Sequence, residues 1–222
     1  METLVIPANE QQRIEALKRY NILDTPTDGT FDRITALAAS IFKVPIAIIS
    51  LVDTDRIWFK SHFGLTLNQI NRDGGLCASA ILSNDPYIVE NASEDPRCLA
   101  NPLVAGDFGL RFYAAVPLHT SDSYNLGTLC LLDKSPRKFT EHEREILMEM
   151  GKIVMDEMEL RLAIRDTVYS VKSITSDIDL HLSDSIRFLD TPDSAVQKDK
   201  IRSHLDASRL FIRNLQQRLN DL

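Results

Sequence analysis

The chain has few of the residues from which disulfide frameworks and structural metal sites are built. Its three cysteines, Cys77, Cys98 and Cys130, are odd in number and widely spaced, and none belongs to a CxxC pair. Disulfide-stapled domains and structural zinc sites need more cysteines at closer, regular spacing. The sequence therefore predicts neither a disulfide framework nor a structural zinc site.

Long apolar runs and an excess of basic charge are also missing. The longest apolar stretch, residues 44–52, is much shorter than the roughly 20 residues that a helix needs to span a bilayer. Residues 1–4 lack the basic and apolar regions of a secretory signal. A net charge of −7 argues against nucleic acid as a partner. We expect a cytoplasmic chain without membrane contact, although a fragment of a larger membrane receptor would have the same composition.

A complete catalytic constellation is absent from the sequence as well. There is no glycine-rich phosphate loop, no nucleophile–histidine–acid pattern and no cluster of metal-ligating residues. The sequence therefore does not predict an enzyme.

What the chain does contain is a change of pattern near residue 140, from mixed helices and strands to almost continuous helix. Before that point we expect helices at residues 8–20, 31–42 and 77–82. The expected strands are residues 44–52, 57–63, 87–89, 111–118 and 125–132. Short turns between successive strands indicate antiparallel pairing. We therefore expect one α+β domain at residues 1–160 and a helical region at residues 161–222.

The helical region begins with a capping box, Thr140 followed by Glu143. Apolar residues then recur at helical spacing to Leu189, with Ile153 and Leu160 near the start, and the pattern breaks at Thr191-Pro192-Asp193. A heptad pattern follows in the second helix. A lone hairpin would leave apolar residues exposed, so the sequence predicts a homodimeric four-helix bundle. The predicted dimerisation residues are Ile164, Val168, Val171, Ile178, Leu182, Ile201, Leu205, Ile212, Leu215 and Leu219.

Many separated segments between about residues 8 and 165 resemble the GAF sensor-domain family. They include Leu23-Asp-Thr-Pro, Phe31-Asp-Arg-Ile-Thr, Ile49-Ser-Leu-Val-Asp, Trp58-Phe-Lys-Ser, Leu76-Cys-Ala-Ser-Ala-Ile, Asn101-Pro-Leu-Val, Arg111-Phe-Tyr-Ala-Ala-Val-Pro-Leu and Leu126-Gly-Thr-Leu-Cys. The resemblance implies a six-stranded antiparallel sheet flanked by helices, with a ligand pocket on one sheet face. The hairpin is similar in layout to the dimerisation region of sensor histidine kinases.

The resemblance also implies which side chains would wall the pocket. They are Phe59, Phe63, Cys77, Ile88, Arg111, Tyr113 and Leu129. An aromatic-lined cavity with one arginine suits a small anionic or aromatic ligand. The alternative is that the aromatic residues are ordinary core and that Arg111 pairs with an acidic side chain.

Three cofactors known in the resembled family are not expected. The signature of the cyclic-nucleotide-binding members is missing. Covalent bilin attachment uses a cysteine followed by histidine, whereas the cysteines here precede Ala78, Leu99 and Leu131. Heme needs an axial histidine in the pocket, and His62 and His119 fall near strand ends, where histidine is usually solvated.

A thiol enzyme is an alternative from another functional class. Gly75-Leu-Cys-Ala-Ser resembles a segment of the free methionine sulfoxide reductases, which are small GAF proteins. Cys77 at the start of a short helix would have a lowered pKa. However, Ala78 replaces a glycine of that segment, and those enzymes lack the helical region. A free cysteine is more often a small buried apolar residue.

His181 is the one candidate phospho-acceptor on the first long helix. The acidic neighbour that would act as general base is missing, because Leu182 follows. A residue at the edge of a helix bundle is the simpler interpretation. Altogether the sequence predicts a dimeric sensor module that binds a small ligand or a partner and relays a change along its helices; the alternative outside sensing is a purely structural dimerisation module.

Overall fold

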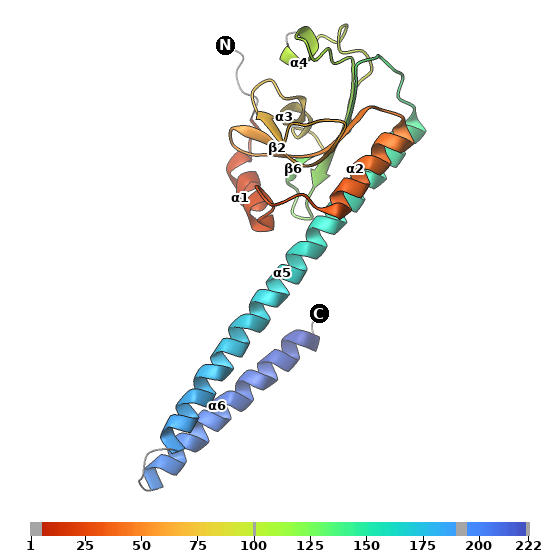
Figure 1. Ribbon diagram of the computed structural model, residues 1–222. Helices are drawn as coiled ribbons and strands as arrows, with labels where there is room; N and C mark the ends of the chain where they lie inside the picture. The colour runs from red at the N-terminus through yellow and green to blue at the C-terminus, as the bar shows by residue number, and fades with distance from the viewer. Residues whose placement is uncertain (1–5, 100, 190–194, 221–222) are drawn as a thin grey trace. The chain divides into compact units, whose positions relative to one another are not determined.

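The computed structural model describes residues 6–99, 101–189 and 195–220 (Figure 1). The chain divides into two compact units, Met1–Leu160 and Arg161–Leu222. The helices are α1 (Glu10–Tyr20), α2 (Gly29–Phe42), α3 (Leu76–Ala80), α4 (Pro102–Ala105), α5 (Glu141–Leu189) and α6 (Ala195–Asn220). The strands are β1 (Ile46–Val52), β2 (Arg56–Phe63), β3 (Gln69–Asn71), β4 (Tyr87–Val89), β5 (Phe112–His119) and β6 (Asn125–Asp133).

The first unit is built on one six-stranded sheet in the order β3-β2-β1-β6-β5-β4. Every pair of neighbouring strands is antiparallel. The α+β fold with a six-stranded antiparallel sheet is therefore confirmed. Two short elements, β3 and α4, had no expected counterpart, because three or four residues are too few to show a periodic pattern.

The two central strands, β1 and β6, form the middle of the core. All seven residues of β1 are buried, as its continuous apolar run predicts for a strand covered on both faces. The strands approach closely at Gly127, where an added Cβ would lie 1.8 Å from the carbonyl oxygen of Ser50. Any other residue at position 127 would push β6 away from β1.

The sheet has two differently covered faces, which we name by the helix on each. On the α3 face, α3 packs against an apolar cluster that includes Ile48, Phe59, Tyr113 and Leu132. On the α2 face, α2 contacts β1 and β2. Because successive residues of a strand point to opposite faces, the antiparallel register assigns each strand residue to one face.

Strand β2 carries a bulge that changes its alternation. Ser50 pairs with Phe59 and Ile49 pairs with Ser61, so Lys60 is the extra residue. Ser61 lies on the α2 face, where its hydroxyl is 2.9 Å from the hydroxyl of Thr35. Lys60 is buried and donates from Nζ to Thr25 Oγ1 and to the carbonyl of Pro26. The bulge thereby brings Ser61 against α2 and Lys60 against the connector that precedes α2.

Helix α5 begins with the capping box that the sequence predicts. The backbone N–H of Thr140 donates to Glu143, and the N–H of Glu143 donates to the hydroxyl of Thr140. The buried face of this first stretch includes Leu147, Met150, Val154, Met155 and Met158. Ile153 and Leu160 of the predicted apolar row are exposed in the single chain, so these two residues do not face the sheet. An apolar spacing of three and four fits two neighbouring helical faces, and the sheet selected the other one.

The second unit contains the continuation of α5 together with α6. The ring of His181 lies 5.2 Å from that of Phe211 and 6.3 Å from that of His204, between centroids. The residues at the predicted break, 190–194, and the side chain of Leu219 lie outside the described residues. Among the helices that the structure describes, none has the length and apolar character to cross a membrane.

Candidate functional site

A cluster of thiols and hydroxyls lies at the centre of the α3 face. The sulfur of Cys77, in α3, is 4.0 Å from the sulfur of Cys130, in β6. The Tyr113 hydroxyl, from β5, donates to the Cys77 sulfur at 3.3 Å. The hydroxyls of Ser50 and Thr128 lie 2.9 Å apart beside the two thiols. We call these five residues the thiol cluster.

Local structure explains how four elements meet at the thiol cluster. Thr128 and Cys130 are two residues apart in β6, so they share one face, and Ser50 is the cross-strand partner of Thr128. Helix α3 can approach the sheet because Gly75 precedes it: an added Cβ would lie 2.2 Å from the Ile57 side chain. Cys77 is thereby held against the centre of the sheet.

The thiol cluster is almost completely buried, and its thiols affect each other's ionisation. Hydrogen bonding to Cys130, and then to the hydroxyls of Ser50, Tyr113 and Thr128, lowers the pKa of Cys77 despite its burial. Burial, followed by the neighbouring Cys77, raises the pKa of Cys130 well above its ordinary value. Burial likewise raises the pKa of Tyr113. If one thiol of the pair ionises, it is Cys77.

The chemistry available in the thiol cluster is that of a dithiol. Cys77 can be stabilised as a thiolate by the hydroxyl donors around it, and Cys130 is a second sulfur in contact with the first. The described residues contain no group of three or more histidine, cysteine or acidic side chains that could hold a metal ion. His62 and His119 are not part of the thiol cluster. His62 is hydrogen-bonded to Asn68, and His119 is hydrogen-bonded to Asn125.

A hollow of about 480 Å³ lies beside β2, away from the thiol cluster. Its wall combines the indole of Trp58 with charged and polar side chains, among them Asp32, Lys60 and Ser61. Ser61 donates to Asp32 at 2.7 Å. Such a mixture of aromatic surface and both signs of charge can hold a small polar molecule.

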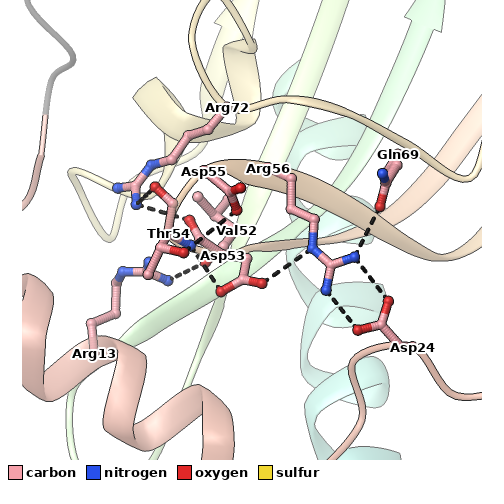
Figure 2. A network of polar contacts seen from close by, with 9 residues as sticks. All are labelled: Arg13, Asp24, Val52, Asp53, Thr54, Asp55, Arg56, Gln69 and Arg72. Carbon is pink, nitrogen blue, oxygen red and sulfur yellow. Dashed lines mark hydrogen bonds and ion pairs between the residues drawn. The ribbon is translucent and has the colours of Figure 1, made fainter.

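A network of arginines fixes the turn between β1 and β2 (Figure 2). The fully buried guanidinium of Arg13 donates to the carbonyl of Val52, and that of Arg72 donates to the carbonyl of Asp53. Both arginines also contact Glu10. Burial alone would raise the pKa of Glu10, but the two arginines lower it to about 2. The network pins α1 to the end of β1.

A further charged pair closes the outer side of the same turn. Figure 2 shows Arg56 between Asp53, Asp24 and Gln69. The Asp24–Arg56 pair is 2.6 Å long, but Asp24 is largely exposed, so its contribution to stability is small. This arrangement serves the fold, since it ties the connector after α1 to β2.

In the second unit, a hollow of about 480 Å³ separates parts of α5 and α6. It is lined by Ile174, Asp177, Phe211, Asn214 and other polar residues. His181 is half-buried beside Phe211. The rings of Phe211 and His204 lie beside His181, and its interpretation as a residue at the edge of a helix bundle stays a prediction.

Comparison with known families decides the assignment of the first unit. The model of the GAF domain matches residues 26–157, which is more than half of the chain. The chain belongs to the GAF domain family. This confirms the resemblance that the sequence segments indicated.

Individual relatives agree with the GAF assignment. A cyclic di-GMP phosphodiesterase from Pseudomonas aeruginosa is 38% identical over 156 residues, which cover 70% of this chain. The match spans only 27% of that relative's length. The GAF domain of an Acinetobacter phosphoenolpyruvate-protein phosphotransferase has a TM-score of 0.51 at 19% identity, over 70% of this chain and 98% of that one.

A structural neighbour from an enzyme class shares the same fold. The type II free methionine-R-sulfoxide reductase of Thermoplasma acidophilum has a TM-score of 0.50 at 14% identity, over 64% of this chain and 94% of that one. At this identity the likeness concerns the GAF fold alone.

The structure brings together three of the seven residues predicted to wall the GAF pocket. Phe59, Cys77 and Tyr113 all belong to the apolar cluster of the α3 face. Ile88 and Leu129 lie on the opposite face, which corrects the sequence interpretation. Leu129 lies between Thr128 and Cys130, two residues of the thiol cluster, so its side chain points to the other face of the sheet. Ile88 likewise lies between Tyr87 and Val89, which both pack on the α3 face.

The other two predicted pocket residues lie at the margins of the GAF unit. Phe63 is 46% exposed at the end of β2. The half-buried Arg111 donates to the carbonyls of Val104 and Leu110. It therefore contacts α4 through backbone acceptors, whereas the alternative interpretation of the sequence had expected an acidic partner for Arg111.

Sequence reasoning missed three members of the thiol cluster: Ser50, Thr128 and Cys130. The alternation of β6 places Thr128 and Cys130 on one face, and this signal was readable in the sequence. Which face would be covered by α3, and hence meet Cys77, depends on tertiary packing.

Proposed function

We propose that the chain is the input and relay portion of a signalling protein. The GAF unit would receive the signal, as a small ligand or a partner, and α5 would carry a conformational change toward an output. The family supports the sensory role. The match to about a quarter of a phosphodiesterase supports the idea that such a segment works alongside a separate catalytic part.

The start of α5 is connected to several parts of the GAF unit, which supports the relay. The Arg137 guanidinium donates to the carbonyl of Phe42, at the end of α2, and to Glu143, in the first turn of α5. The ring of Phe139 packs on those of Phe42 and Phe112. A shift of α2 or β5 would therefore be felt at the first turn of α5.

The exposed apolar residues of the second unit carry the proposal of a homodimer. Ile164 and Val168 of α5 are 54% and 46% exposed, and Leu205 and Ile212 of α6 are 52% and 45% exposed. Val171 and Leu182 are also exposed, while Ile178, Ile201 and Leu215 are half-buried. Soluble proteins rarely leave so long an apolar row uncovered. A second copy would cover it with matching residues, as in a four-helix bundle.

The homodimer is tested by placing charge in the apolar row. We expect the double variant Val168→Asp/Leu205→Asp to sediment as a monomer where the unaltered chain sediments as a dimer. The matched control is Tyr169→Asp/Leu210→Asp, which alters two exposed residues outside the predicted row. If both double variants lose the dimer equally, or if the unaltered chain is itself a monomer, this interface is refuted.

The input is tested by native mass spectrometry of the purified chain. A retained molecule, released on unfolding, would identify a ligand. The hollow beside β2 and the α3 face are then separated by Trp58→Ala and Tyr113→Phe, since each alters one of the two places. If no molecule is retained and none binds in a metabolite screen, a partner protein or a purely structural dimerisation role replaces the ligand.

A second candidate function is a thiol enzyme of the methionine sulfoxide reductase type. The contact between Cys77 and Cys130 favours it, because such an enzyme needs an attacking and a resolving thiol. One sulfoxide and the two thiols would yield a thioether, a disulfide and water. The reaction is tested by assaying methionine formation from free methionine sulfoxide with dithiothreitol, with Cys77→Ser as control. No difference between the two chains eliminates the enzyme.

A further inference from the structure

Two of the three cysteines of the chain, far apart in the sequence, are in contact inside the GAF core. Cys77 and Cys130 are separated by 53 positions, yet their sulfurs lie 4.0 Å apart. A disulfide needs about 2.05 Å between the sulfurs, so the two sulfurs would have to approach each other by about 2 Å. We propose that Cys77 and Cys130 form a reversible dithiol–disulfide site that is oxidised by small hydroperoxides.

The surroundings of the two thiols differ in the way that such a reaction requires. Cys77 accepts the hydrogen bond of the Tyr113 hydroxyl and is 6% exposed, whereas Cys130 is fully buried. The donor favours a thiolate at Cys77, which is the nucleophilic form. Cys77 is therefore the attacking sulfur, and Cys130 is the resolving sulfur.

The reaction proceeds in two balanced steps. The Cys77 thiolate attacks one oxygen of the hydroperoxide and the O–O bond breaks. The leaving oxygen takes up the proton that Cys77 released on ionising and departs as alcohol or water. Cys77 is then a sulfenic acid. The Cys130 sulfur attacks the sulfur of Cys77, the S–O bond breaks, and water leaves with the proton of Cys130. In sum, two thiols and one hydroperoxide give a disulfide, one alcohol or water molecule, and one further water.

Burial determines which oxidants can react. All five side chains of the thiol cluster are at least nine-tenths buried. A bulky disulfide such as oxidised glutathione cannot reach Cys77 without local opening, whereas hydrogen peroxide is little larger than water. We therefore expect hydrogen peroxide to react with the folded chain far faster than oxidised glutathione does.

The disulfide would have a structural consequence for the GAF unit. It would tie α3 directly to β6, which pairs with both β1 and β5. The redox site deepens the proposed sensory function by naming an oxidant as the input. Only this signalling role of the disulfide rests on the proposed function. Formation of the disulfide does not depend on dimerisation or on the relay.

Cys98 provides an internal control. It is buried in the same unit, but burial raises its pKa, and it is not part of the thiol cluster. The variant Cys98→Ser therefore keeps the proposed pair as its two cysteines. It removes every alternative pairing within one chain.

The test is hydrogen peroxide treatment of folded Cys98→Ser and unaltered chains, followed by alkylation under denaturing conditions and peptide mapping. We expect an intramolecular Cys77–Cys130 disulfide in both chains, reversed by dithiothreitol, and a several-fold slower reaction in Tyr113→Phe. In Cys130→Ser, a sulfenic-acid probe should label Cys77. Two free thiols in oxidised Cys98→Ser, or sulfinic acid at Cys77 without a disulfide, would overturn the proposal.

The redox site and the proposed relay fail separately. Spin labels at positions 176 and 203 measure the distance between the two helices of the hairpin. If the Cys77–Cys130 disulfide forms while this distance stays the same, the redox site is kept and an oxidant is rejected as the input. Both labelling positions are exposed in the second unit. A spacing that changes with oxidation in the unaltered chain, but not in Cys77→Ser, would join the two.

Discussion

The two units of the chain differ in what covers their apolar side chains. The GAF unit buries its own core, and even its polar groups close on one another, as in the thiol cluster and the Glu10 network. The helical unit leaves apolar residues exposed along both α5 and α6. The first unit therefore has a buried core of its own, whereas the homodimer that we propose would cover the exposed apolar row of the second unit. The stability of the two units should respond differently to substitution.

The single tryptophan, Trp58, makes this comparison measurable, because it lies in β2 of the GAF unit. Its fluorescence reports unfolding of that unit alone. The following four substitutions are ordered by their expected effect on the free energy of unfolding of the GAF unit.

Leu129→Ala should have the largest effect. Leu129 is fully buried in the central strand β6, and removing such a side chain costs about 3–4 kcal/mol through lost burial and the remaining cavity. Urea unfolding followed by Trp58 fluorescence measures the change, with the exposed Leu67→Ala as the control. A loss below about 1 kcal/mol would show that the α2 face is loosely packed.

Glu10→Gln should cost about 2 kcal/mol, because it leaves Arg13 and Arg72 without their shared carboxylate. The pKa of Glu10 is about 2 in the folded chain, against 4.5 as its ordinary value. Its contribution is therefore complete above about pH 4.5 and is lost as the pH falls toward 2. The difference in the free energy of unfolding between the unaltered and Glu10→Gln chains should therefore shrink between pH 7 and pH 2. For the exposed control Glu15→Gln, the difference should stay small at every pH. A difference for Glu10→Gln that does not change with pH would argue against the network.

Thr140→Ala should cost about 1 kcal/mol, the usual value of a helix N-cap. The substitution removes one of the two reciprocal hydrogen bonds that begin α5, and the bond from the Thr140 N–H to Glu143 remains. Thr66→Ala, at an exposed loop position, is the control. No difference between the two would mean that packing alone fixes the start of α5.

Leu205→Ala should change the unfolding of the GAF unit by less than about 0.5 kcal/mol, the usual effect of an exposed substitution. Its expected effect is on self-association, which should weaken relative to Leu210→Ala. Both side chains are more than half exposed and lie in α6. A large effect of Leu205→Ala on Trp58 fluorescence would contradict the separation of the two units.

The sequence predicted those features that depend on local pattern. The apolar run of β1, the residues of β4 and the capping box of α5 were found where they were expected. The face of a side chain was harder to predict: alternation separates Leu129 from Cys130, but packing decides which of them meets α3. For the same reason the rotation of α5, which buries Leu147 and exposes Ile153, could not be predicted from spacing.

The candidate site depended even more on tertiary structure. Cys77 and Tyr113 were predicted as pocket residues from the GAF resemblance, and the structure places them in contact. The contact between Cys77 and Cys130 joins a short helix to a distant strand, and nothing in their spacing indicates it. The role of Lys60 depends on a bulge that exists only once β1 and β2 have paired.

Sedimentation of the full chain over a wide range of dilution tests the central claim most directly. If the helical unit requires a partner, the chain should sediment at twice 25.1 kDa until strong dilution, and helix content should fall as the dimer dissociates. A species of 25.1 kDa at every concentration, with its helix content unchanged, would contradict the account.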